Sequence, residues 1–143
     1  MQKKINKIDY KKSTEYFRQC SKQGYMPSTN ALISMCMSGL IDKTPIFEEC
    51  LSSLKGLAYS GNIDAIRRVG NIYYEGIGTT RDYTEALSWY EKAAKLGDVW
   101  SRNRLGEMYR DGKGTNVDLE KAYDVFTKLI ENFFSFINKF IRI

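Results

Sequence analysis

Residues 69–78 of the chain read VGNIYYEGIG, and residues 105–114 read LGEMYRDGKG. The two stretches, with the residues that follow them, share six positions that are always 36 residues apart: Gly70 and Gly106, Tyr73 and Tyr109, Gly76 and Gly112, Gly78 and Gly114, Asp82 and Asp118, Ala86 and Ala122. A fixed period of roughly 20–50 residues is the signature of a repeat architecture, in which each unit buries its apolar face against the next. We therefore expect an array of similar units.

Composition places the chain among ordinary globular domains. Its 143 residues are enough for one domain with a core, and 43% hydrophobic with 27% charged residues argue against general disorder. Histidine is absent, which removes the commonest general base and the commonest metal ligand. The three cysteines, Cys20, Cys36 and Cys50, are an odd number without a close pair, so we expect buried thiols and a cytoplasmic location.

The N-terminus is basic and carries part of the net charge of +5, in Lys3, Lys4, Lys7, Lys11 and Lys12. Such a cluster can attract nucleic acid or anionic lipid, but a solvated helix end is the simpler interpretation. No apolar run follows it that would make a secretory signal. Nor does any stretch approach the ~18 apolar residues of a membrane span.

The repeat frame extends backward from the two clear copies. Residues 9–24 (DYKKSTEYFRQCSKQG) align without a gap on residues 82–97 (DYTEALSWYEKAAKLG), so the chain opens on the second helix of a repeat. Two more helices are expected before residue 62, one over 27–38 ending at Gly39, and one that Thr44 caps and that stops at Gly61. One domain, 1–143, is thereby divided as follows: half repeat 9–24, degenerate repeat 25–61, repeats 62–97 and 98–132, and C-terminal cap 133–143.

Each clear unit should contain a helix, a Gly-x-Gly loop and a second helix. Asp82 and Asp118 stand where a carboxylate can cap the second helix. The loop glycines recur at the repeat period with no strand before them, so they predict positive φ angles between helices rather than a phosphate-binding loop. Because the loops are short, successive helices should be antiparallel neighbours.

The C-terminal segment departs from the pattern. Phe133 stands where Gly97 would recur, and further apolar residues follow it: Phe134, Phe136, Ile137, Phe140, Ile141 and Ile143. Two structural interpretations stay open, a continued last helix and a worn first helix of another unit, and either would close the end of the array. A functional interpretation is membrane or partner docking through an amphipathic tail that contains Lys139 and Arg142.

The pattern L-G-x-x-Y-x-x-G-x-G, followed by D-x-x-x-A-x-x-W-Y-x-x-A-A-x-x-G, resembles the SEL-one-like repeat (SLR), a branch of the tetratricopeptide-like helical hairpins. Its second half is carried by Asp82, Ala86, Trp89, Tyr90, Ala93, Ala94 and Gly97. The third unit replaces the Trp-Tyr pair by Val125-Phe126 and the Ala-Ala pair by Leu129-Ile130. The resemblance is strong over 62–131 and weak over 9–61.

The resemblance implies an all-α fold, a right-handed α/α superhelix of about seven antiparallel helices. Three SLR hairpins would follow a half repeat, and a hydrophobic C-terminal helix would cap the array. It also implies membership of a family made mostly of protein-binding scaffolds and adaptors, many of them bacterial.

No residue pattern predicts catalysis, a cofactor or a metal. Cys20 and Cys50 occupy small-residue positions of the repeat and are interpreted as core. Carboxylates at helical spacing, such as Glu107 and Asp111, are typical of solvated helix faces, since no apolar pocket is indicated that would shift a pKa.

If the family geometry holds, the first helix of each unit lines a concave face. This predicts protein-binding residues in the two clear units, Asp64, Arg67, Asn71, Tyr74, Trp100, Asn103, Glu107 and Arg110, and in the first unit Asn30, Ser34 and Met37. Trp, Tyr and Arg are enriched in binding hot spots. For Trp100, packing between repeats and partner binding both stay open.

We therefore expect a non-enzymatic scaffold that engages another protein through its concave surface. The family suggests two narrower roles, a bacterial immunity protein that neutralises a cognate toxin, and an adaptor or regulator. The alternative is membrane-surface or nucleic-acid association through the basic N-terminus and the Phe-rich tail.

Overall fold

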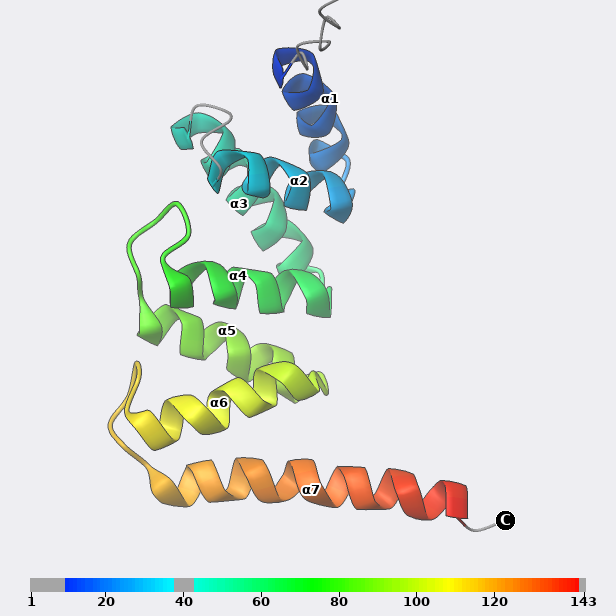
Figure 1. Cartoon of the computed structure of the whole chain (residues 1–143), viewed down its shortest axis with the longest axis vertical. Helices are drawn as coiled ribbons and strands as arrows, with labels where there is room; N and C mark the ends of the chain where they lie inside the picture. Colours follow the sequence, from blue (N-terminus) through cyan, green and yellow to red (C-terminus); the bar gives the residue numbers. More distant parts are fainter. Residues whose placement is uncertain (1–9, 38–42, 142–143) are drawn as a thin grey trace, which may run out of the picture.

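The computed structural model describes residues 10–37 and 43–141, and the fold is stated for that part of the chain. It contains seven α-helices and no strand: α1 Tyr10–Lys22, α2 Met26–Met37, α3 Lys43–Tyr59, α4 Ile63–Glu75, α5 Tyr83–Lys95, α6 Val99–Asp111 and α7 Leu119–Ile141. Consecutive helices pack on one another in chain order and stack along one direction (Figure 1). The protein is an all-α helical solenoid, as the repeat predicts.

The helix boundaries follow the sequence with small differences. The helix predicted over 27–38 is α2, while the stop predicted at Gly39 lies outside the described residues. α3 has the bounds Lys43–Tyr59, and the side chain of Thr44 lies outside what the structure describes, so its role as a cap stays a prediction.

Side-chain caps start the helices of the clear units. Each capping oxygen accepts a hydrogen bond from the backbone amide three residues later, at 2.9–3.0 Å, and the caps are Asn62, Asp82, Asp98 and Asp118. The predicted caps Asp82 and Asp118 are thus confirmed. Such a side chain is worth about 1 kcal/mol of stability relative to alanine.

The two Gly-x-Gly loops have the same conformation in both units. Gly76 and Gly78 have φ angles of 69° and 66°, and Gly112 and Gly114 have 67° and 74°, so all four are left-handed. Each loop ends with the amide of the next capping aspartate donating to a tyrosine carbonyl of the preceding helix, at 2.9 Å and 2.8 Å. The predicted positive φ angles are confirmed, and the loops are turns that reverse the chain.

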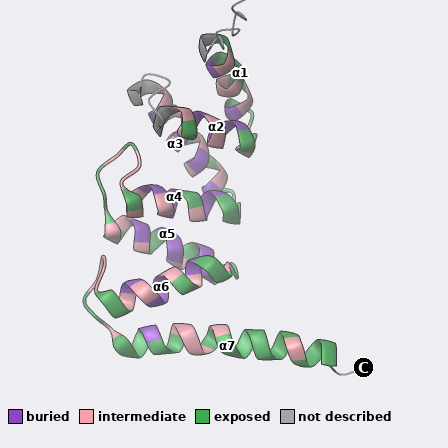
Figure 2. Ribbon diagram, in the orientation of Figure 1, coloured by how far each residue is buried: buried purple, intermediate pink, exposed green. Residues whose placement is uncertain are grey.

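The core lies between the helix layers and continues from unit to unit. One cluster surrounds Trp89, which is 2% exposed, and includes Leu54 and Val69. A second cluster centres on Tyr90, 1% exposed, with Met108. Figure 2 shows the buried residues concentrated in the middle helices, with α7 largely exposed.

Gly70 lets α4 approach the buried ring of Tyr90 closely. A Cβ at this position would lie 2.7 Å from Cε1 of Tyr90, well inside van der Waals contact. We expect Gly70→Ala to lower the free energy of unfolding by about 1–3 kcal/mol, as overpacking does in well-packed cores. Urea unfolding followed by circular dichroism measures it.

The matched control is Gly56→Ala in α3. A Cβ at Gly56 meets nothing within 4 Å, so this variant should gain about 0.5–1 kcal/mol from helix propensity alone. Equal changes for the two variants would contradict the close approach at Tyr90.

α7 runs as one helix through the predicted boundary between 132 and 133. Of the two structural interpretations, the continued last helix is the one observed. It has 23 residues against 13 in α6, so it extends about 15 Å beyond its neighbour, at 1.5 Å of rise per residue. Figure 1 shows its C-terminal turns projecting past the stack. Residues 142 and 143 lie outside the described part of the chain.

Candidate functional site

The eight residues predicted in the two clear units all lie on α4 and α6, the first helices of adjacent hairpins. Three of them, Asn71, Tyr74 and Trp100, meet around a set of aromatic rings. Asp64 and Arg67 lie apart, at the start of α4. In the first unit, Asn30 is half-buried and Ser34 exposed on α2, and the side chain of Met37 lies outside the described residues.

The centre of this face is a group of rings and cations that we call the aromatic–cation cluster: Tyr74, Tyr83, Tyr90, Trp100, Arg104 and Lys113. The guanidinium carbon of Arg104 lies 5.0 Å from the ring centroid of Tyr74 and 4.9 Å from that of Trp100. A cation over an aromatic face within about 6 Å is attracted by roughly 0.5–2 kcal/mol. Arg104 thus holds together one ring from α4 and one from α6.

Trp100 is fixed in this cluster but not covered by it. Its ring meets the buried ring of Tyr90 edge-on, with centroids 5.7 Å apart. Nevertheless 41% of Trp100 is exposed. Packing between repeats and an accessible surface therefore coexist at this residue.

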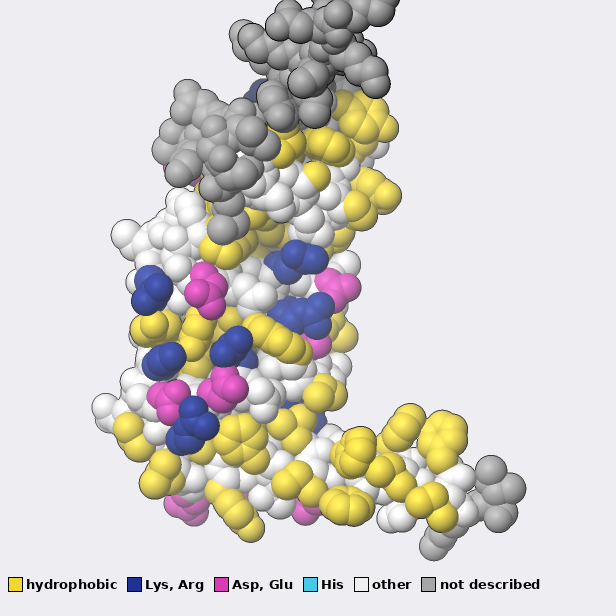
Figure 3. Space-filling view, viewed as in Figure 1, with side chains coloured by type: hydrophobic (Ala, Val, Ile, Leu, Met, Phe, Trp, Pro, Cys, Tyr) yellow, Lys and Arg dark blue, Asp and Glu magenta, His cyan; other side chains and the backbone are white. Residues whose placement is uncertain are grey.

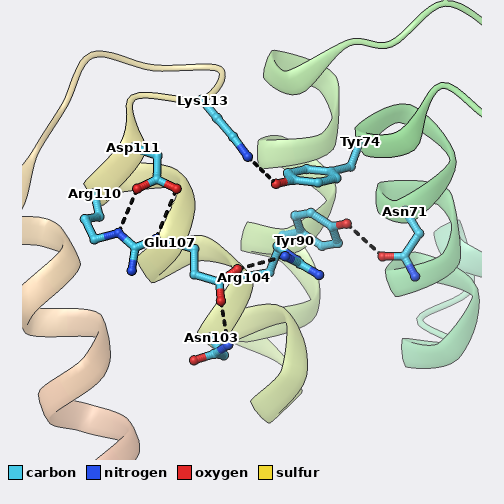
Figure 4. A network of polar contacts seen from close by, with 9 residues as sticks. All are labelled: Asn71, Tyr74, Tyr90, Asn103, Arg104, Glu107, Arg110, Asp111 and Lys113. Carbon is cyan, nitrogen blue, oxygen red and sulfur yellow. Dashed lines mark hydrogen bonds and ion pairs between the residues drawn. The ribbon is translucent and has the colours of Figure 1, made fainter.

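Lys113 brings the Gly-x-Gly loop of the later unit onto the first helix of the earlier one. Its Nζ donates to the Tyr74 hydroxyl at 2.8 Å and lies 5.1 Å from the centroid of that ring. This hydrogen bond raises the pKa of Lys113 above its ordinary value. Figure 4 shows Lys113 and Tyr74 pointing toward each other.

Asn71 anchors the buried side of the face. The hydroxyl of Tyr90 donates to its Oδ1 at 2.7 Å. Burial raises the pKa of the Tyr90 phenol, so this group stays a hydrogen-bond donor at every physiological pH. Asn71 therefore holds Tyr90 in place on the buried side of the cluster.

Glu107 orients Arg104. Its two oxygens accept from Arg104 at 2.8 Å and from Asn103 at 3.3 Å, which leaves Asn103 exposed at the edge of the cluster. Arg110 does not join this network and pairs with Asp111 at 2.7 Å, apart from Tyr74 in Figure 4. That hydrogen bond lowers the pKa of Asp111.

Arg67 joins the starts of the two first helices. Its guanidinium donates to Oδ1 of Asp98 at 2.9 Å and also pairs with Asp64. The other oxygen of Asp98 accepts from the amide and the hydroxyl of Ser101, at 2.9 Å and 2.6 Å. Arg67 thus fixes the cap of α6, and it is only 30% exposed.

An open groove continues from Trp100 to α7. We call it the end groove; among its lining residues are Ile63, Arg67, Leu96, Trp100, Asn103 and Phe133. Three of the predicted binding residues therefore share a hollow with exposed apolar side chains. Leu129 and Phe133 of α7, on either side of the predicted boundary, supply one wall.

Sequence reasoning missed three members of the cluster, Tyr83, Arg104 and Lys113. Arg104 follows Trp100 by one helical turn, which is a signal for contact on one face. Lys113 lies between two loop glycines, and nothing local indicates that it reaches Tyr74 in the preceding unit.

Within the described chain, no group of three or more Asp, Glu or Cys side chains could hold a metal ion. None of the helices described is long and apolar enough to cross a membrane.

Part of the chain matches a known family of repeats. The Sel1 repeat family matches residues 63–98 and 101–130. No curated protein matches the chain in sequence.

Three solved structures have related folds. A protective antigen from uropathogenic Escherichia coli strains, displaying an SLR fold, is 28% identical with a TM-score of 0.63; the match covers 82% of this chain and 25% of the antigen, so this chain spans a quarter of that protein. A Sel1 repeat protein from Oxalobacter formigenes is 24% identical, TM-score 0.65, with 82% and 89% covered. Cysteine rich protein B of Helicobacter pylori is 24% identical, TM-score 0.59, with 86% and 87% covered.

Stacked helical hairpins with a repeated loop and cap define the class of α/α solenoid repeat proteins. Within that class, residues 63–98 and 101–130 match the Sel1 repeat, and the fold is similar to that of solved Sel1 and SLR repeat proteins. Proteins built from Sel1 repeats are generally non-enzymatic scaffolds that mediate protein–protein interactions.

Proposed function

We propose that this protein is a non-enzymatic scaffold that binds a partner protein on the face shared by α4 and α6, with Trp100 as the central anchor. One observation carries the proposal. Trp100 is 41% exposed although Arg104 and Tyr90 hold its ring in place. A large ring that is both ordered and accessible has the properties of a binding hot spot.

The fixed position of the ring favours affinity. Ordering a mobile side chain on binding costs about 0.5–1.5 kcal/mol, and this loss is avoided where the side chain is already held. Tyr74 and Arg104 are held in the same way, by Lys113 and Glu107. The cluster is therefore preorganised for a flat apolar or aromatic group of the partner.

The charges around the cluster favour a protein over a nucleic acid. The face carries three cations, Arg67, Arg104 and Lys113. Asp64 pairs with Arg67 and Glu107 pairs with Arg104, while Lys113 donates to Tyr74 beside them. A polyanion needs uncompensated Lys and Arg to replace its counterions. A mixed face suits a partner that also carries both signs of charge.

As narrower proposals, the protein acts in the bacterial cytoplasm, as an immunity protein that neutralises a cognate toxin or as an adaptor. The resemblance to the family supports these roles, since its small bacterial members include regulators, adaptors and immunity proteins. Co-expression with the products of neighbouring genes tests the first role. Growth protection would support it, and failure both to bind and to protect would remove it while leaving the scaffold role in place.

The central test uses Trp100→Ala on the full chain with the partner found by pull-down. We expect the dissociation constant to rise about thirtyfold or more, the loss typical of a hot-spot residue. Stability should fall by only about 1 kcal/mol, because the ring is partly exposed already. Isothermal titration calorimetry and urea unfolding give the two quantities.

The control is Tyr16→Ala on α1, an aromatic side chain that is 66% exposed and remote from the cluster. It should leave affinity unchanged. Equal losses for both variants, or a Trp100→Ala protein that unfolds outright, would remove Trp100 as the anchor. Asn103→Ala, at an exposed edge, then tests whether the face binds at all.

A further inference from the structure

α7 carries a line of apolar side chains that no described helix covers. Five large members of this line have 55–72% of their surface exposed: Leu119, Tyr123, Ile130, Phe134 and Ile141. Ile137 lies on the same line and is half-buried, whereas the ring of Phe126, between Tyr123 and Ile130, lies against Gly106 of α6. We call the five exposed residues and Ile137 the α7 stripe. Figure 3 shows hydrophobic side chains along α7 out to the end that projects from the stack.

The stripe follows an 11-residue period, because Ile130 follows Leu119 by 11 positions and Ile141 follows Ile130 by 11. Tyr123 and Phe134 are separated by the same interval. An 11-residue repeat corresponds to 3.67 residues per turn, close to the 3.6 of a straight helix. The stripe therefore runs nearly straight along the helix axis and offers its whole length to a second helix.

The exposed area is larger than a solitary protein usually shows. Three more phenylalanines near the C-terminal end, Phe133, Phe136 and Phe140, lie on another side of the helix than the stripe and are each 61–62% exposed. Counted all round, α7 presents on the order of 1,000 Å² of apolar surface. The largest apolar patch of a typical monomer is about 300–600 Å². A standard protein–protein interface buries about 800 Å² per partner, which this helix alone can supply.

The surface that α7 presents differs from the one that α5 presents to the next hairpin. α5 ends at Lys95 and is followed by Gly97, whose φ of +94° lets the chain turn into α6. Phe133 stands at the corresponding place in α7, and the helix continues. Ile130 likewise replaces Ala94, a small residue that lies in the core between α5 and α6.

The charges of α7 do not favour an anionic membrane either. The helix has three basic residues, Lys121, Lys128 and Lys139, and three acidic ones, Glu120, Asp124 and Glu131. Interfacial helices that bind anionic lipid have a polar face rich in Lys and Arg. A face with balanced charges can instead pair with a copy of itself without net repulsion.

We propose that the α7 stripe is the contact through which two copies of this chain form a twofold symmetric dimer. In such an interface the same patch faces itself, so one self-complementary helix is sufficient. The two α7 helices lie side by side along the stripe. The aromatic–cation cluster stays free on each copy, so the dimer presents two partner-binding faces.

Sedimentation equilibrium of the full chain, from low to high micromolar concentration, tests this. The wild type should be a dimer that dissociates on dilution. Phe134→Glu should raise the dimer dissociation constant about a hundredfold or more, because every dimer contains the change twice. The matched control Ser135→Glu introduces the same charge at the adjacent exposed residue and should leave the dimer intact.

A wild type that is monomeric at all concentrations overturns the proposal, and its binding to phosphatidylcholine–phosphatidylserine vesicles would assign the stripe to lipid instead. A Phe134→Glu protein that remains dimeric, or a Ser135→Glu protein weakened equally, also overturns it. If Phe134→Glu does not fold, Ile141→Ser in the last described turn decides by the same measurement, with at least a tenfold rise expected. Trp100→Ala should stay dimeric, so this test and that of the scaffold role fail separately.

Discussion

Trp89→Ala should lower the free energy of unfolding by about 3–5 kcal/mol, the range for large-to-small changes of buried aromatic residues. Trp89 is 2% exposed and lies in the core cluster that α3, α4 and α5 share. Its ring stacks against Tyr59 at 5.5 Å and against the ammonium of Lys92 at 4.1 Å, and its Nε1 donates to Glu85. Removing the ring leaves a cavity where two hairpins meet.

Trp100→Ala serves as the comparison, since it removes the same side chain from a position that is 41% exposed. Urea unfolding by circular dichroism should show a lower midpoint for Trp89→Ala than for Trp100→Ala. Trp89→Phe, which keeps most of the apolar volume, should recover part of the loss. If both alanine variants unfold at the same midpoint, Trp89 is not the core residue described here.

Gly114→Ala should lower the free energy of unfolding by about 2–5 kcal/mol, from two causes. The residue has a φ of +74°, which a residue with a Cβ adopts at a penalty of about 1–2 kcal/mol. In addition, a Cβ would lie 2.3 Å from the carbonyl oxygen of Tyr83. This oxygen belongs to the backbone and cannot rotate away as a side-chain atom could, so the start of α5 must shift. We expect this shift to lower the free energy of unfolding further, by about 1–3 kcal/mol.

Gly97→Ala separates these causes. Gly97 also has a positive φ, +94°, but a Cβ there meets nothing within 4 Å. It should show only the penalty for the left-handed conformation, about 1–2 kcal/mol. Thermal or urea unfolding of the two variants gives the difference, and equal losses would refute the close contact between the loop and Tyr83.

The elements that recur with the repeat were predictable because their signals are local. The period located the helices of the clear units, and capping carboxylates and turn glycines act within a few residues of their own position. Asp82, Asp118 and the four loop glycines have the predicted roles.

The contacts between units could not be predicted. Arg104 lies between Tyr74 and Trp100 only because of the distance and angle between successive hairpins, which no sequence motif states. The same holds for Lys113, which reaches back 39 residues to Tyr74. The predicted binding residues of the two clear units lie on α4 and α6, but the cations that hold their aromatic rings could be recognised only from the three-dimensional structure.

Two side-chain hydrogen bonds that skip α5 connect α4 and the residues next to α6. Arg67 reaches Asp98 where both helices begin, and Lys113 reaches Tyr74 where both end. Solenoids bend readily along their length, since each repeat contacts only its neighbours. Contacts at both ends of the α4–α6 pair oppose bending and twisting between the two hairpins, whereas a single contact would still allow rotation about it. The segment from α4 to α6 should therefore be stiffer than the rest of the solenoid, and a partner has to match the fixed distance between these two helices.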